Sequence, residues 1–348
     1  MFTILSLNVF IGSPLPYIFN GTPGLAHSKR LDRFINYLSD SNVDVVCLQE
    51  LYCSWSRAYI QKKLPMYRMI STNIDARTNM GRIRIMLLWL ITGGFIWMIV
   101  TGFLWTATQI IPLSSISYYD VDYDTLNSII FTTCLIIGRY ICRYAALENW
   151  LRGDHTGLTI LWKPKSLKLL EHEQTLFESQ EGDFMNTVLR RGFQVAAFEL
   201  PCKRVITIIN THLNALGDDT SRLSQVKQLL AFKDVNCVNE TAANTTLLAG
   251  DFNIGPQSIS INHVLENGFK DCGGVDMGYT WDNINTYTQG WIRIPNERID
   301  FIFHKPGPKC DINVVLSELV LQKNPVSDHY GVLARFATTK SQCNKDVE

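Results

Sequence analysis

The sequence predicts an α/β fold in which two packed β-sheets are flanked by helices. Many short segments are apolar and rich in strand-favouring residues, few segments have the 3.6-residue periodicity of an amphipathic helix, and both kinds occur along the whole chain. An apolar sheet face needs a second layer to cover it. Many strands with few helices therefore favour two sheets packed together, with the helices outside.

The individual elements follow from the local pattern. His27–Leu38 has apolar residues on one helical face, and Ser221–Phe232 is a second amphipathic helix, with Leu223, Val226 and Leu230 expected to point inward. The expected strands are Thr3–Phe10, Val43–Leu48, Gly157–Trp162, Phe193–Leu200, Val205–Leu213, Thr246–Gly250, Arg298–His304, Ile312–Leu321 and Gly331–Phe336.

Composition limits the classes of function. The chain has 348 residues, 46% of them hydrophobic, and its 32 Lys+Arg balance its 32 Asp+Glu. A nucleic-acid binder usually has a basic excess, so we do not expect a nucleic acid as partner. Nine cysteines without a C-x-x-C pair predict free thiols in a reducing compartment, and no secretory signal is expected. Use of the N-x-S/T sequons at Asn20, Asn239 and Asn244 stays open.

Residues 79–150 depart from the strand-rich pattern. No charged residue occurs between Arg84 and Asp120, and Ile85–Leu113 is long and apolar enough to cross a bilayer. Leu126–Gly138 is a second, shorter apolar run. A buried core helix is the alternative, but so long an apolar run with three tryptophans is poorly explained by one.

Topology narrows what this insertion can be. If the flanking parts form one catalytic domain, both lie on the same side of a membrane, so the insertion crosses twice, re-enters or lies in the interface. Basic residues on both flanks fit a hairpin with cytoplasmic ends. We therefore expect one catalytic domain over residues 1–348, with an inserted hydrophobic helical hairpin at 79–150, associated with a membrane and facing the cytoplasm.

Polar residues follow several expected strands, just beyond the C-terminal end of each apolar run. Taken singly, each is better explained as a turn, a cap or a satisfied core side chain. Together, carboxylates, amides and histidines at several strand ends are expected to converge where a hard cation and a phosphate bind. The blocks are Leu7-Asn8, Gln49-Glu50, Asn210 to Asn214, Gly250 to Asn253, Arg298 to Phe301 and Ser327 to His329.

In this order, the blocks resemble the endonuclease/exonuclease/phosphatase superfamily over Asn8 to His329. The resemblance implies a four-layer α/β/β/α sandwich of deoxyribonuclease type and metal-dependent hydrolysis of phosphodiesters. Within the superfamily, Ala26–Arg33, Gly157–Lys163 and Gly192–Val195 are similar to segments of the neutral sphingomyelinases. Trp162 departs from the Ser of many relatives, and the apolar insertion is internal, where animal neutral sphingomyelinases have hydrophobic segments at a terminus.

The resemblance implies a metal site. Glu50, helped by Asn8, would hold Mg²⁺, for which Mn²⁺ can substitute, and Asp328 would lie near the metal or its waters. One Glu and one Asn match the oxygen ligands that Mg²⁺ prefers better than they match a zinc site.

The resemblance also implies the groups that act on the phosphate. His329 would be the general base, held in the right tautomer by Asp300. Asp251 would orient the nucleophile. His155 is a further candidate on position alone. The residues implied to bind the phosphoryl oxygens are Asn253, His212 and, with less support, Asn214.

The leading hypothesis is a sphingomyelinase that cleaves sphingomyelin to ceramide and phosphocholine, with the bilayer contacted through residues 79–150. A nuclease or a phosphoinositide phosphatase is the alternative. These polyanionic substrates need several cations near the site, and Arg190, Arg191, Lys203 and Arg204 are not placed by the sequence. An inactive membrane adaptor is the second alternative, which the retention of every expected polar residue disfavours.

Overall fold

The computed structural model describes residues 1–11, 25–52, 54–71, 94, 96–101, 132–134, 156–178, 191–232, 245–288, 295–307 and 312–338. By internal contacts the chain divides into two units. One comprises Met1–Thr72 with Asp154–Glu348, and the other comprises Asn73–Gly153.

Two six-stranded mixed sheets form the first unit. In the first sheet the order β11–β12–β1–β2–β4–β3 corresponds to Ile312–Val320, Gly331–Thr338, Phe2–Ile11, Val45–Leu51, Thr159–Trp162 and Arg68–Ser71. In the second the order β5–β6–β7–β8–β10–β9 corresponds to Lys168–Leu176, Gly192–Glu199, Val205–His212, Thr245–Asp251, Asp300–Lys305 and Lys270–Asp271. β1 pairs with β2 in parallel, as β7 does with β8, and the other pairs are antiparallel.

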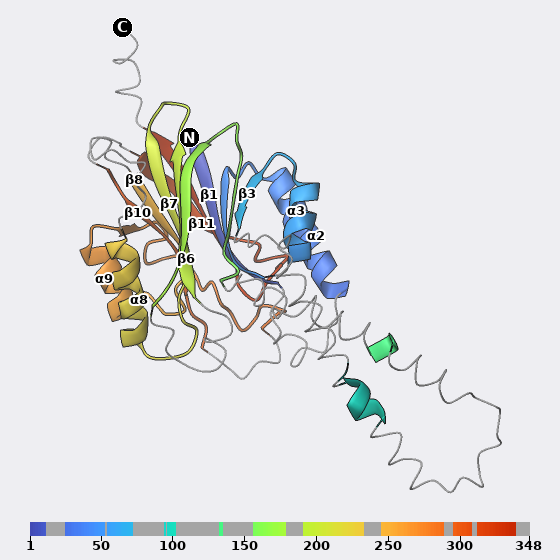
Figure 1. The fold of residues 1–348 in the computed structure, drawn as a ribbon. Helices are drawn as coiled ribbons and strands as arrows, with labels where there is room; N and C mark the ends of the chain where they lie inside the picture. The colour runs from blue at the N-terminus through green and yellow to red at the C-terminus, as the bar shows by residue number, and fades with distance from the viewer. Residues whose placement is uncertain are drawn as a thin grey trace, which may run out of the picture. The chain divides into compact units, whose positions relative to one another are not determined.

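The helices lie on the outer faces of the two sheets. The helices α2 (Leu25–Asp40) and α3 (Ser54–Lys63) cover the first sheet, and α8 (Asp219–Ala231) and α9 (Ile259–Glu266) cover the second (Figure 1). Each of the three interfaces between the layers has its own apolar cluster. The predicted four-layer α/β/β/α sandwich is confirmed.

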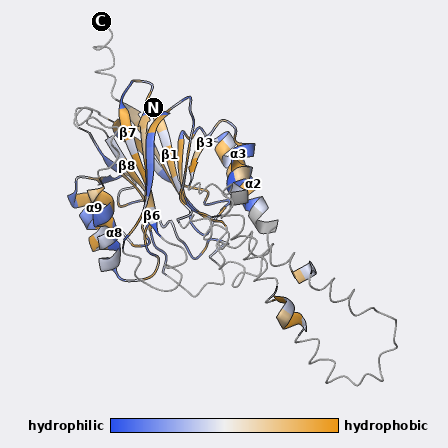
Figure 2. Cartoon of the chain, in the orientation of Figure 1, coloured by the Kyte–Doolittle hydropathy of each residue, from blue (hydrophilic) through white to orange (hydrophobic). Residues whose placement is uncertain are grey.

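Strand β1 illustrates why the inner strands are buried along their whole length and largely apolar. Ile4 packs into the cluster between the two sheets, whereas the next residue, Leu5, packs into the cluster under α2 and α3. Alternate residues of a strand face opposite sides, so a strand covered on both sides is buried at every position and mostly apolar. Figure 2 shows many hydrophobic residues in the strands, with polar residues among them.

The predicted helix Ser221–Phe232 is present as α8, but its buried face is rotated from the expected one. Val226 is buried, whereas Leu223 and Leu230 are only partly buried. Arg222 and Gln225 are buried in their place, because they hydrogen bond to the backbone of the loop after β7. The apolar pattern alone did not predict these polar contacts.

The expected hydrophobic hairpin falls almost wholly outside the described residues. Within it, residues 94, 96–101 and 132–134 are described, and they are helical. Among the helices in the described parts of the chain, none combines the length and the apolar character needed to cross a bilayer. The hairpin stays a prediction, and His155 and the three sequons also lie outside the described residues.

Candidate active site

The topology gathers strand ends from both sheets at one edge of the sandwich. In the strand register, Asn8 lies opposite Gln49, and Asp251 lies opposite both His212 and Asp300. These residues lie at or near the C-terminal ends of β1, β2, β7 and β8. The strands β10 and β12 run antiparallel to their neighbours, so Asp300 and the residues before β12 reach the same edge.

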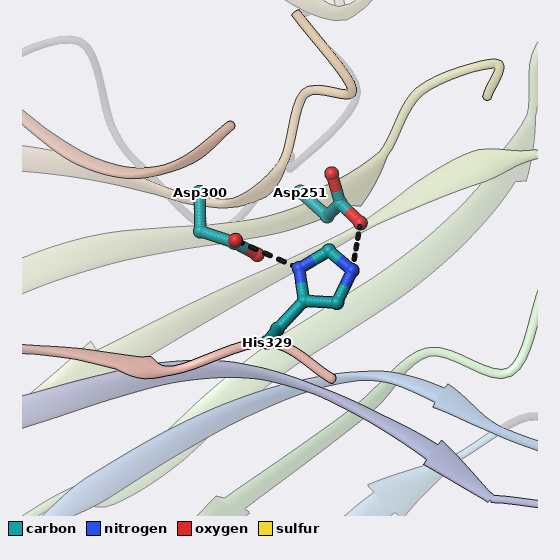
Figure 3. Close-up of side chains that lie close together, drawn as sticks. All are labelled: Asp251, Asp300 and His329. Atoms are coloured by element: carbon teal, nitrogen blue, oxygen red, sulfur yellow. Dashed lines mark hydrogen bonds and ion pairs between the residues drawn. The ribbon is translucent and has the colours of Figure 1, made fainter. Parts of the chain in front are cut away.

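His329, Asp300 and Asp251 form the centre of this edge (Figure 3). Nδ1 of His329 lies 2.8 Å from Oδ2 of Asp300, and Nε2 lies 3.8 Å from Oδ2 of Asp251. Asp300 is fully buried, and the backbone N–H of Asp300 donates to the Thr280 hydroxyl at 3.1 Å. With Nδ1–H donating to Asp300, Nε2 is the nitrogen that can accept a proton inside the site.

Crowded negative charge shifts the pKa values of this group. Burial alone would lower the pKa of His329, but Asp300, Asp251 and Asp328 outweigh it and raise that pKa well above the ordinary value. Burial, together with the charge of Asp300, raises the pKa of Asp251 to about 7. Such shifts, with several groups in contact, are typical of active sites.

Glu50 enters the site from a strained turn at the end of β2. Its φ of 57° is uncommon for a residue with a side chain. The turn is fixed by the Leu51 N–H, which donates to the carbonyl of Gly157 at 2.9 Å. The carboxylate Oε1 of Glu50 lies 3.7 Å from Nη1 of Arg191 and 3.8 Å from Nε2 of His212. Burial raises the pKa of Glu50 in spite of the opposing effect of Arg191.

The donor set fits a divalent metal ion. Ligand atoms of Asp251, Asp300 and His329 all lie within 4.8 Å of one another. Oδ1 of Asp300 is buried and has no hydrogen-bond partner in the described structure. A hard cation would stabilise the charged forms of such crowded carboxylates.

The predicted metal ligands Glu50, Asn8 and Asp328 lie beside this group. Asn8 joins the two sheets, because its amide donates to Oδ2 of Asp251 at 2.9 Å while its Oδ1 accepts from the Phe10 N–H at 3.0 Å. Asp328 accepts from the Ser327 hydroxyl at 3.0 Å and raises the pKa of Glu50. Their roles as metal ligands stay predictions.

Two of the three residues predicted to bind phosphate are brought to Asp251, and one is not. Nε2 of His212 lies 3.4 Å from Oδ2 of Asp251, and the Asn253 N–H donates to Oδ1 of Asp251 at 2.9 Å. Asn214 is instead bound to α8, where its N–H donates to Gln225 at 3.0 Å. Its fully buried side chain lies 3.3 Å from the Ser221 hydroxyl. These contacts give Asn214 a place in the loop that follows His212, and a phosphate contact for it stays a prediction.

Sequence reasoning missed several residues that support the site. The Gln49 amide donates to Oδ1 of Asn210 at 2.8 Å and so ties the two sheets together behind the carboxylates. Arg30 of α2 donates to the carbonyls of Val9 and Val326, both at 2.6 Å, which fastens the loop carrying Asp328. Gln49, Asn210 and Arg30 lie within motifs that the sequence singled out, so their position was the available signal.

The fold and the site together define an α/β sandwich protein of the phosphodiesterase and phosphatase type. The chain belongs to the Endonuclease/Exonuclease/phosphatase family, whose model matches residues 5–329. Members of this family are hydrolases that act on phosphodiester or phosphate groups.

Solved structures of other proteins have the same fold. TDP2 from D. rerio, complexed with a single-strand DNA product, is 17% identical, with a TM-score of 0.58 over 97% of this chain and 99% of that one. A mannosyl-6-phosphatase from Bacteroides thetaiotaomicron is 14% identical, with a TM-score of 0.54 over 97% and 100%. The human Nocturnin catalytic domain is 14% identical, with a TM-score of 0.53 over 97% and 94%. None of the curated proteins compared with the chain matches it.

Proposed function

We propose that this protein is a metal-dependent phosphodiesterase that cleaves sphingomyelin to ceramide and phosphocholine at a membrane surface. The observation that carries the chemistry is the buried His329–Asp300 pair, joined at 2.8 Å, with Nε2 of His329 turned to Asp251. A histidine held in one tautomer by a buried carboxylate is suited to accept a proton from water.

Each residue of the site would have a separate role in hydrolysis. His329 accepts the proton of the attacking water at Nε2, and Asp300 stabilises the imidazolium that forms. Asp251 orients the water, while the side chains of His212 and Asn253 bind the phosphoryl oxygens as charge develops on them. A divalent cation, which Glu50 and Asn8 would hold so that Nε2 of His329 stays available as the base, would polarise a phosphate oxygen and stabilise the leaving alkoxide.

The arginines of the site favour a substrate with a single phosphate over a polyanion. Arg191 is buried and contacts His212 and Glu50, and Arg298 is bound to the carboxylate of Asp271. Each cation is thus already bound to protein groups. A nucleic acid or a phosphoinositide would need several cations that remain available to it.

Two further basic residues that the sequence left unplaced, Lys203 and Arg204, lie away from the site. The turn with Lys203 and Arg204 follows β6, where Glu199 pairs with Val205, whereas His212 pairs with Gly192 at the opposite end of the same two strands. Arg190 lies outside the described residues. The zwitterionic headgroup of sphingomyelin, with one phosphate, is consistent with this distribution of charge.

The lipid part of the proposal rests on the sequence of the insertion and on the resemblance to neutral sphingomyelinases. Ile85–Leu113 has no charged residue. Contact of such a segment with lipid would keep the enzyme at the surface where sphingomyelin is found and raise its effective concentration.

The test is a substrate panel with full-length protein in Mg²⁺. Sphingomyelin vesicles, phosphatidylinositol phosphate vesicles, single-stranded DNA and bis(p-nitrophenyl) phosphate are assayed beside His329→Ala, which reports any contaminating activity. We expect phosphocholine release from sphingomyelin, and its loss in the variant. Cleavage of DNA or of phosphoinositide without phosphocholine release would show that the cleaved compound, and not sphingomyelin, is the substrate. No hydrolysis of any ester would favour the inactive adaptor.

A further inference from the structure

Arg191 brings one guanidinium into contact with three parts of the site. It directly precedes Gly192, which pairs with His212 across β6 and β7, and it is 5% exposed. Its Nη1 lies 2.8 Å from Nδ1 of His212, 3.2 Å from the Tyr52 hydroxyl and 3.7 Å from Oε1 of Glu50. The contact to His212 is the shortest of the three.

This contact determines which nitrogen of His212 bears the proton. A guanidinium has N–H donors and no acceptor, so Nδ1 of His212 has to accept the hydrogen bond. A neutral imidazole that accepts at Nδ1 carries its proton on Nε2. Nε2 lies 3.4 Å from Oδ2 of Asp251 and 3.8 Å from Oε1 of Glu50. The N–H of His212 is therefore directed among the carboxylates of the site.

The two histidines beside Asp251 are consequently held in opposite states. Nδ1 of His329 faces the carboxylate of Asp300, whereas Nδ1 of His212 faces the cation of Arg191. Because Nδ1 of His212 accepts from Arg191, this ring cannot carry a proton on both nitrogens and is neutral. One ring is suited to accept a proton at Nε2 and the other to donate a hydrogen bond from Nε2.

We propose that Arg191 is a positioning residue that holds His212 as the neutral Nε2–H tautomer, so that His212 donates a hydrogen bond to a phosphoryl oxygen of the substrate. The phosphate contact rests on the proposed function. The tautomer follows from the contact between Arg191 and His212 alone and can be measured without substrate.

The first measurement is the tautomer of His212 in full-length protein labelled with ¹⁵N-histidine, in Mg²⁺. Long-range ¹H–¹⁵N correlation spectra distinguish an imidazole protonated on Nε2 from one protonated on Nδ1, and His212→Gln assigns the signal. We expect the Nε2–H pattern in the unmodified protein. A proton on Nδ1, or on both nitrogens, would overturn the proposal.

The second measurement compares variants of Arg191 on bis(p-nitrophenyl) phosphate. Arg191→Met should lose the fixed tautomer and lower kcat by about 10- to 100-fold, as for other residues that orient a ligand of the reacting group, with a smaller effect on KM. Arg191→Lys keeps the charge and should recover part of kcat. The control is Lys203→Met, a cation whose side chain is 81% exposed at the far end of the same strands, and it should leave both readouts unchanged.

A milder variant keeps the test decisive if Arg191→Met does not fold. Tyr52→Phe removes one acceptor of the guanidinium while keeping the ring, and should give a mixed tautomer and a kcat lower by a few-fold. Folded Arg191→Met or Tyr52→Phe protein with the original tautomer and kcat would refute the proposal. If His212 shows the Nε2–H pattern and loses it in the variants, but no phosphate ester is cleaved, the positioning role stands and the proposed function fails.

Discussion

The buried carboxylates of the site are tolerated because each accepts a hydrogen bond from a nearby polar group. Asp300 accepts from His329, Asp251 accepts from Asn8 and from the backbone N–H of Asn253, and Asp328 accepts from Ser327. A buried charge without such partners would cost several kcal/mol. Substitution of one of these partners should therefore affect the particular carboxylate to which it is bound.

Removal of the imidazole of His329 should abolish most turnover. We expect His329→Ala to lower kcat by roughly 10²–10⁴, the usual contribution of a general base, with little change in KM. The assay is hydrolysis of bis(p-nitrophenyl) phosphate. His263→Ala on α9, whose side chain is 30% exposed, is the matched control and should be unaffected. Near-normal kcat in His329→Ala would refute the assigned base, and His212 would then be the next candidate.

The acid limb of the pH–rate profile should depend on Asp300. The base acts only when deprotonated, and the neighbouring carboxylates raise the pKa of His329, so activity is lost as the pH falls through this raised pKa. In Asp300→Asn one of these negative charges is removed, so the pKa falls and the limb moves to lower pH. The maximal kcat should also fall, because the ring loses its acceptor. An unshifted limb in kcat/KM would contradict this account.

At the scale of the elements, the junction between the end of β2 and the segment before β4 controls the position of Glu50. A Cβ on Gly157 would lie 2.7 Å from the Tyr52 ring and 3.1 Å from the Cα of Glu50. The φ of Gly157 is +63°, which also favours glycine. A side chain at this position would have to displace the Tyr52 ring and press on the backbone of Glu50.

Gly157→Ala should therefore destabilise the protein and weaken metal binding together. The control is Gly274→Ala, which has nearly the same φ, +61°, but nothing within 4 Å of the added Cβ, so it reports backbone strain alone, about 1 kcal/mol. Urea unfolding and the Mg²⁺ dependence of activity are measured for both variants. If both variants lose the same stability and the Mg²⁺ dependence is unchanged, the close contact with Tyr52 and Glu50 controls neither stability nor metal binding.

The elements that sequence analysis missed are short or have a weak apolar pattern, and β3, with four residues, is one of the short ones. Strand β5, Lys168–Leu176, lies at an edge of its sheet and has no fully buried residue, and β9 has only two residues. Edge strands commonly carry charged residues, which blurs the alternation that identifies a strand. Helix α3, Ser54–Lys63, is short and largely polar. The helix α9, Ile259–Glu266, is also short.

At the scale of the whole molecule, binding of a metal ion should both stabilise the folded protein and be required for its activity. Activity should require Mg²⁺ or Mn²⁺ and vanish with EDTA, because the site offers mainly hard oxygen ligands. Binding to the folded state should raise Tm of the chelated protein, with the shift growing as Mg²⁺ is added. Glu50→Gln should keep the fold and lose most of both effects. Full activity after exhaustive chelation would refute the metal requirement.

The insertion should be separable from the catalytic sandwich. Ser71 of β3 pairs with Thr159 of β4, so the chain enters and leaves the sheet at neighbouring positions that a short Gly/Ser linker can join. Replacing residues 79–150 with this linker should release the protein from membranes and preserve hydrolysis of bis(p-nitrophenyl) phosphate. Cleavage of sphingomyelin in vesicles should weaken. Unfolding of the deleted protein would place the insertion in the core, and unchanged vesicle cleavage would refute membrane anchoring.

The sequence by itself determined the sandwich and the edge at which the site lies. Inner strands such as β1 are covered on both faces and are therefore buried along their whole length and largely apolar, and the polar blocks near their ends mark one common edge. Only the tertiary structure decided which side chains meet there. Arg191 reaches His212 and Glu50, and Asn214 binds α8, because strand register and the packing of the two sheets set these distances. Local pattern carries no information about a partner on another strand or sheet, and the protonation state of each histidine depends on that partner.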